Sequence, residues 1–190
     1  RPFTPTPIFP TRPMRNSPPA AGPAVTRILG IDPGSRFTGY GVIEVKVDRI
    51  TSVHHGVIKT GGGDFPERLG VIFDGIRDVI DRYGPSEVAI ESVFISRNPG
   101  SALKLGQARG AAMCAAISLG LAVAEYSPRS VKQAIVGRGA ADKVQIQHMV
   151  QVLLSLQEKP AEDAADALAV ALCHQHTQQT ADRMQALQQP

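Results

Sequence analysis

The sequence is poor in cysteine and lacks any long apolar run, and each shortage excludes a class of protein. Cysteine occurs twice in 190 residues, at Cys114 and Cys173, in alanine-rich surroundings without the Cys-x-x-Cys or Cys/His spacing of a metal site. We therefore expect two free, buried thiols and a reducing cytoplasm. No stretch of 18 apolar residues occurs, so the sequence predicts no membrane-spanning helix and no membrane partner.

Acidic residues are missing from the first 26 positions, where eight of the 15 prolines gather. Such a segment cannot bury enough apolar surface to fold, so we expect residues 1–26 to be a disordered tail. The printed chain does not begin with Met, which leaves a natural extension, a cloning remnant or a transit-like segment as origins. The prolines argue against the amphipathic helix of a transit segment.

The net charge of +3 comes from the tail. Three of the 20 basic residues lie there, so residues 27–190 carry 17 basic against 17 acidic groups. Residues 97–143 are nevertheless basic, with only Glu125 and Asp142 opposing Arg97, Lys104, Arg109, Arg129, Lys132, Arg138 and Lys143. This excess is typical of a nucleic-acid-binding surface, although solvated faces of unrelated helices would give the same count.

The apolar pattern predicts an α/β domain over residues 27–177, followed by a frayed tail at 178–190. Three strands with turn-length connections are expected to form an antiparallel meander, and a strand after the first helix should lie parallel to a neighbour. The expected strands are 27–32, 38–46, 50–60, 87–94 and 122–126. The expected helices are 69–83, 101–119, 129–136, a segment around 146–154, and 161–174. The fold class is thus a five-stranded mixed sheet flanked by helices.

A single carboxylate, Asp32, ends the apolar run Ile28–Ile31 and is followed by Pro33-Gly34. A carboxylate beside a buried strand is costly to desolvate unless a cation or hydrogen-bond donors meet it. An ordinary Asp-Pro-Gly turn in a hairpin explains the pattern equally well when the segment is taken alone.

Three further acids are predicted to face the same interior. Glu91 has apolar neighbours on both sides in its strand, and a crossover connection would place it beside Asp32. Asp163 and Asp166 share one face of the last helix, among small alanines that would let this helix approach a sheet closely. Acids in a first helical turn also complement the helix dipole, which is the interpretation we adopt for Glu162.

Four inward carboxylates would repel one another unless cations lie between them. Ligation by oxygen alone favours Mg²⁺ or Mn²⁺. Four carboxylates can hold two such ions about 3.5 to 4 Å apart, which is the arrangement used for phosphodiester hydrolysis. The pattern therefore indicates a two-metal nuclease site.

The sequence resembles a known family, the RuvC Holliday-junction resolvases. The likeness covers about residues 27–177 and rests on the segments ILGIDPGSRFTGYGVIE, AIESVF, NPGSALKLGQARGAA, VKQAIVGRG, ADKVQIQHMV and DAADALAVALCH. It implies a ribonuclease-H-like fold and paired symmetric nicks across four-way DNA junctions during recombination and repair. It also implies that Asp32, Glu91, Asp163 and Asp166 are the catalytic, metal-binding carboxylates. The proline-rich start and Ser92 depart from the family pattern.

The resemblance assigns junction binding to the segment after Glu91 and to Lys132 and Lys143, which agrees with the basic excess. Phe94 would then stack on unpaired bases at the crossover, although a core phenylalanine at a strand end is the ordinary alternative. Lys143 would help to hold the scissile phosphate. The expected DNA-binding residues are Phe94, Arg97, Lys104, Arg109, Lys132 and Lys143.

A twofold homodimer is expected, because a four-way junction presents two equivalent strands to be cut. The Gly- and Ala-rich helix Ser101 to Leu119 offers an interface, unless its small residues only allow packing on its own sheet. Whether the branch-migration proteins RuvA and RuvB bind the chain stays open. Two alternatives are considered. The first is a noncatalytic junction-binding module, but the presence of all four acids argues against it. The second is a phosphotransferase of the actin and sugar-kinase type. The second would need a further phosphate loop that the sequence does not offer.

Overall fold

A computed structural model describes residues 25–92, 98–139 and 141–188. The expected disordered tail lies almost wholly outside these residues. Phe94 and Arg97, two of the expected DNA-binding residues, also lie outside the described residues.

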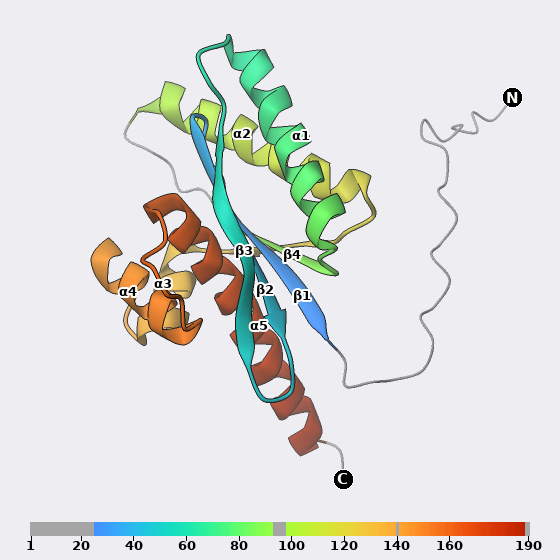
Figure 1. The fold of residues 1–190 in the computed structure, drawn as a ribbon, viewed down its shortest axis with the longest axis vertical. Coiled ribbons are helices and arrows are strands. Elements are labelled where there is room, and N and C mark those ends of the chain that lie inside the picture. Colours follow the sequence, from blue (N-terminus) through green and yellow to red (C-terminus); the bar gives the residue numbers. More distant parts are fainter. Residues whose placement is uncertain (1–24, 93–97, 140, 189–190) are drawn as a thin grey trace, which may run out of the picture.

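Five strands form one mixed sheet in the order β3-β2-β1-β4-β5 (Figure 1). The first three pair antiparallel, whereas β4 runs parallel to β1 and to β5. The strands are β1 (Thr26–Asp32), β2 (Phe37–Val45), β3 (Ile50–Lys59), β4 (Glu87–Glu91) and β5 (Val123–Tyr126). The expected meander and the parallel fourth strand are confirmed.

Helices cover both faces of the sheet (Figure 1). The helices are α1 (Phe65–Tyr83), α2 (Pro99–Ser118), α3 (Pro128–Val136), α4 (Lys143–Leu153) and α5 (Glu162–Gln188). The local sequence explains where α1 begins and ends. Asp64 and Glu67 form a reciprocal capping box at its start, and Gly84 closes its end in the left-handed conformation.

Each face of the sheet has its own hydrophobic core, because successive side chains of a strand point to opposite sides. Leu29 and Ile31 of β1 pack with α1 and α2, whereas Ile28 of the same strand packs with α3, α4 and α5. The strand β4 alternates in the same way, with Val88 and Ile90 on the α1 face. Ala89 lies on the α5 face.

Glycines in β1 and β2 let α5 lie directly on the sheet. A Cβ atom at Gly30 would overlap the carbonyl oxygen of Ala167, and one at Gly39 would overlap that of Asp163. At Gly41 the added atom would lie 2.6 Å from Cδ2 of Leu168. The close approach expected from the alanines of this helix is confirmed, and the matching glycines of the sheet make it possible.

Three expectations are corrected. The last helix does not end near His174 but continues to Gln188, so the residues from 178 to 188 are helical rather than frayed. Cys173 is buried as expected, whereas Cys114 is exposed on α2. Leu153, expected on the buried face of its helix, is 39% exposed because Leu154 takes the inward position.

Within the described residues, no helix is both long and apolar enough to cross a membrane.

Candidate active site

The parallel pairing of β1 and β4 brings Asp32 and Glu91 together. Ile31 pairs with Ile90, so the next residues of the two strands end side by side at the same edge of the sheet. Asp32 is two positions beyond Gly30, which faces α5, and Glu91 is two positions beyond Ala89. Both carboxylates therefore point to the α5 face, where a strand period of two places them.

The first turns of α5 bring the other two acids to this edge. Asp166 lines a cavity of about 260 Å³ together with Asp32 and Glu91. Asp163 lies against Gly39 of β2 and does not line the cavity, although its charge acts on Asp32 and Asp166. The remaining wall comes from α3 and α4, through Pro128, Val131, Lys132, Lys143 and Ile146.

Burial and mutual repulsion raise the pKa values of the three carboxyl groups that line the cavity. Burial, followed by the charges of Glu91, Asp166 and Asp163, raises the pKa of Asp32 from 3.8 to about 8. Burial and the charge of Asp166 raise the pKa of Glu91 to about 7, against the opposing effect of Lys132 and Lys143. The pKa of Asp166 is also raised, with burial as the main cause. The cavity thus concentrates negative charge that a cation would stabilise.

The donor set fits a hard divalent cation, because it consists of carboxylate oxygens on three different elements. Within the described part of the chain, no three His, Cys, Asp or Glu side chains are grouped closely enough to chelate one ion. Ligation by Asp32, Glu91, Asp163 and Asp166 therefore requires rotation of their side chains. The backbone brings the four acids together, but their carboxylates are not fixed in a finished coordination shell.

Two lysines stand at the cavity, although neither is near an acid of the site in the sequence. Lys132 comes from α3 and Lys143 from the first position of α4. Lys143 pairs with Glu162, and its side chain is 67% exposed. That ion pair, together with the charges of Asp166 and Asp32, raises the pKa of Lys143 and keeps it cationic. Glu162 was expected only to complement the helix dipole, and its ion pair with Lys143 was not predicted from the sequence.

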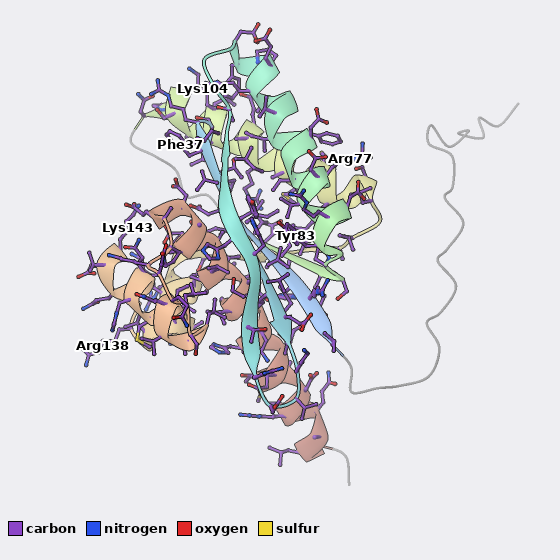
Figure 2. All side chains as sticks on the ribbon, viewed as in Figure 1. Phe37, Arg77, Tyr83, Lys104, Arg138 and Lys143 are labelled. Carbon is purple, nitrogen blue, oxygen red and sulfur yellow. The ribbon has the colours of Figure 1, made fainter. Side chains whose placement is uncertain are left out.

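Lys104 and Arg109 do not join this group. Both belong to α2 on the opposite side of the sheet, and Figure 2 shows Lys104 far from Lys143. Arg109 forms an ion pair with Glu125 of β5, and its side chain is only 19% exposed. Lys104 is exposed, with its ammonium group 5.8 Å from the centre of the Phe65 ring. The basic excess of residues 97–143 is thus divided between two faces.

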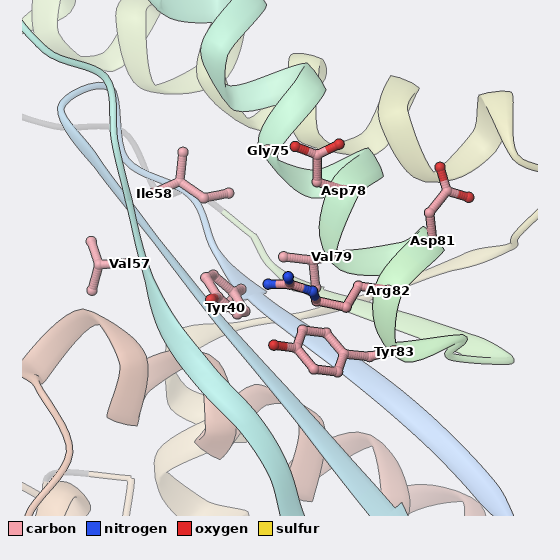
Figure 3. Close-up of a pocket in the computed structure, with 9 residues that line it drawn as sticks. All are labelled: Tyr40, Val57, Ile58, Gly75, Asp78, Val79, Asp81, Arg82 and Tyr83. Atoms are coloured by element: carbon pink, nitrogen blue, oxygen red, sulfur yellow. The ribbon is translucent and has the colours of Figure 1, made fainter.

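A second hollow, of about 680 Å³, lies between α1 and the β2–β3 pair (Figure 3). Its lining includes Tyr40, Arg82 and Tyr83, and the His54 ring stacks between the two tyrosine rings. The charged groups there have both signs, and the hollow contains none of the four acids. It is therefore separate from the carboxylate site.

Sequence reasoning missed the apolar wall of the cavity, formed by Pro128, Val131 and Ile146. The helical period does place Val131 and Ile146 on buried faces of their helices. It does not indicate which surface those faces meet, because that depends on how α3 and α4 pack on α5.

Comparison with known proteins places this chain in a family. The sequence matches the family of the crossover junction endodeoxyribonuclease RuvC over residues 28–174. RuvC of Tolumonas auensis is 58% identical over 160 residues, a match that covers 84% of this chain and 92% of that protein. RuvC of Pseudomonas aeruginosa is 57% identical over 156 residues, covering 82% and 90%.

Solved structures agree with the sequence match. Thermus thermophilus RuvC in complex with a Holliday junction substrate has a TM-score of 0.77 and 38% identity, covering 82% of this chain and 96% of that chain. The yeast mitochondrial Holliday junction resolvase Ydc2 has a TM-score of 0.59 at 15% identity, covering 78% and 77%, which is a likeness of fold. The expected ribonuclease-H-like architecture is confirmed. The chain belongs to the RuvC family of crossover junction endodeoxyribonucleases.

Proposed function

We propose that this protein resolves four-way DNA junctions by metal-dependent hydrolysis of phosphodiester bonds, with paired symmetric nicks, during recombination and repair in the cytoplasm. The observation that carries the proposal is the gathering of Asp32, Glu91 and Asp166 with two lysines around one cavity. A relative at 38% identity was solved with a Holliday junction substrate, and its chain is matched over 96% of its length.

Nucleases of this family depend on a metal ion. In this chain Asp32, Glu91, Asp163 and Asp166 would hold two Mg²⁺ ions, for which Mn²⁺ would substitute. When bound, such ions supply an activated water and stabilise the charge on the attacking and leaving oxygens. The protein's own contribution is a buried set of carboxylates whose raised pKa values reflect the cost of leaving that charge uncompensated.

Lys132 and Lys143 are the proposed phosphate contacts, because they stand at the cavity and one is largely exposed. Lys143 would release Glu162 and hold the scissile phosphate beside the acids. Lys104, exposed near the start of α2, would contact a more distant part of the junction. Arg109 is committed to Glu125, so it is a weaker DNA-binding candidate than the sequence indicated. Phe94 and Arg97 remain sequence-based predictions.

We also propose a homodimer through the outer face of α2. The sequence left open whether the small residues of this helix form a dimer interface or only allow packing on its own sheet. Its alanines serve the packing, because Ala108, Ala112, Ala115 and Ala116 are buried. A Cβ atom added at Gly106 or Gly110, in contrast, would meet no described atom within 4 Å. Leu103 is 65% exposed and Ile117 is 57% exposed on the same helix. Light scattering at micromolar concentration should give twice the mass of one chain.

Cleavage of a labelled synthetic four-way junction, with Mg²⁺ and with EDTA, tests the function. We expect paired nicks that require Mg²⁺ and are lost in Asp166→Asn, while linear duplex of the same sequence stays intact. Binding without cleavage at any Mg²⁺ or Mn²⁺ concentration would favour the noncatalytic module. ATP hydrolysis without cleavage would favour the phosphotransferase.

A further inference from the structure

A chain of three polar side chains, centred on a buried histidine, crosses the α5 face of the sheet, apart from the carboxylate site. His174 lies in the middle of α5 and is 6% exposed. Its Nδ1 atom is 2.8 Å from the hydroxyl oxygen of Tyr126, and its Nε2 atom is 2.9 Å from Oε2 of Glu87. The chain therefore joins α5 to β5 on one side and to β4 on the other.

The hydrogen-bonding chemistry of the three side chains determines which atom carries each proton. A carboxylate only accepts hydrogen bonds, so Nε2 of His174 carries the proton that is donated to Glu87, and Nδ1 accepts from the Tyr126 hydroxyl. Burial raises the pKa of Tyr126, which keeps the phenol protonated as the donor. The atom of the Gln178 amide that lies 3.1 Å from Nε2 of His174 is placed as the amide nitrogen. Because Nε2 already carries a proton, the amide oxygen and nitrogen are assigned in exchanged positions, so that the oxygen accepts from that N–H.

The main chain links Tyr126 to the active site. Tyr126 pairs with Glu91 in the β4–β5 register. The backbone N–H of Ser92 donates to the carbonyl oxygen of Tyr126 at 2.8 Å, and the Ser92 hydroxyl donates to the same oxygen at 3.1 Å. Tyr126 is thus held by its backbone beside Glu91 and by its side chain on α5.

This attachment is significant because β5 is a four-residue strand that, among the described strands, pairs with β4 alone and forms an edge of the sheet. A short edge strand is among the parts of a sheet that open most readily. Side-chain contacts restrain it from opposite faces: Glu125 pairs with Arg109 of α2, whereas Tyr126 bonds His174 and interacts with Thr177, both of α5. The contacts of Tyr126 lie on the face that carries the acids.

We propose that the Glu87–His174–Tyr126 chain is a positioning device for Glu91, which fixes the end of β4 against α5 so that the four acids converge on a divalent cation. The inference deepens the proposed function and rests on it. None of the three side chains touches the reacting atoms. They act through the backbone of β5 and Ser92, in the way that outer hydrogen bonds orient ligands at metal sites.

The test compares two Tyr→Phe variants of the full-length protein, each lacking one hydroxyl. Tyr126→Phe removes the bond to His174, whereas Tyr40→Phe, the control, removes a 3.3 Å bond to His54 on the other face of the sheet. The thermal midpoint of unfolding is measured against Mn²⁺ concentration, because an ion that binds the folded state raises this midpoint. Junction cleavage by the parent protein is measured in parallel.

We expect Tyr126→Phe to need about three- to tenfold more Mn²⁺ for half of the stabilisation, while Tyr40→Phe stays within about twofold of the parent. A purely structural role would lower the midpoint without Mn²⁺ and leave the Mn²⁺ dependence unchanged. That result, in a parent that cleaves junctions, would overturn the inference and leave the proposed function standing. A parent that neither binds Mn²⁺ nor cleaves would overturn both.

Glu87→Ala keeps the inference testable if Tyr126→Phe does not fold. Glu87 is partly exposed, with 31% of its side-chain surface accessible, so the truncation leaves only a small cavity. It removes the acceptor that orients the His174 ring. A Mn²⁺ dependence equal to that of the parent in this variant would also contradict the positioning role.

Discussion

The face of the sheet under α1 and α2 is covered mainly with branched aliphatic side chains, whereas the face under α5 combines Ile28 and Ile43 with glycines, alanines and carboxylates. On the first face Leu29, Ile31 and Val42 fill the space to the helices. On the second, Gly30 and Gly41 have no side chains, so α5 packs directly against the backbone of the strands. The same strands therefore build two different interfaces.

The difference shows how a small domain can combine stability with a costly site. Aliphatic packing on the α1 face contributes favourable burial and involves none of the four acids. The α5 face brings its helix close enough for Asp163 and Asp166 to stand beside Asp32, at the cost of raised carboxylate pKa values. Changes on the α5 face should therefore alter metal-dependent chemistry, and changes on the α1 face should alter stability alone.

The largest expected effect is at an acid of α5. Asp163→Asn should reduce junction cleavage by at least about 10³-fold, because it removes a proposed metal ligand, while junction affinity is retained. Asp182→Asn makes the same change at an exposed position of the same helix and serves as the control. Cleavage near the parent rate in Asp163→Asn would exclude this acid from the metal site.

Filling the gap under α5 comes next. Gly30→Val places atoms where the Ala167 carbonyl now lies, so the helix must shift. We expect a loss of more than about 3 kcal/mol in the free energy of unfolding, measured in urea, with loss of cleavage in the molecules that still fold. A folded, fully active variant would show that α5 has room to move.

Leu29→Ala makes the opposite change one residue earlier. It empties space on the α1 face and should cost about 2 to 4 kcal/mol of stability. The cleavage rate per folded molecule should stay within about twofold of the parent, since the carboxylate face is untouched. A stability loss accompanied by a tenfold fall in that rate would mean that the two faces are not independent.

The pH dependence of stability has a definite sign in EDTA. The pKa of Asp32 is about 8 in the folded protein and near 3.8 otherwise, so between these values the folded state binds the proton more tightly. This contribution of Asp32 to stability should therefore be fully present below pH 4 and fall as pH rises to 8, by roughly 1 to 3 kcal/mol after allowance for solvent screening. The difference in stability between the parent and Asp32→Asn should change with pH accordingly in urea titrations, whereas that between the parent and Asp182→Asn should not. The same pH dependence in Asp32→Asn as in the parent would contradict the assignment.

The smallest effect concerns the lysines. Lys132→Gln should weaken junction binding by about three- to tenfold and lower the log-log salt slope by about 0.9, the loss of one phosphate contact. Arg183→Gln, an exposed change on the second half of α5, should leave the slope unchanged. Fluorescence anisotropy at several salt concentrations measures both, and equal slopes for the two variants would remove Lys132 from the binding surface.

The antiparallel meander, the parallel fourth strand and the approach of Glu91 to Asp32 were predictable, because short connections and a right-handed crossover constrain them. The length of α5 was not, since residues 177–187 are exposed and carry no apolar period to mark a helix. The hydrogen bonds of His174 were missed for a different reason, because its two partners lie 48 and 87 residues away in the sequence. The close packing at Gly30 and Gly39 likewise depends on a helix more than 120 positions later, which local pattern does not identify.

The contact between Gly39 and Asp163 has one more consequence. The height of this acid above the sheet is set by hard-core repulsion between a strand and a helix backbone, with no ion pair involved. Excluded volume does not change with ionic strength or protonation. The frame that carries the four acids therefore keeps its dimensions under conditions in which their charges vary.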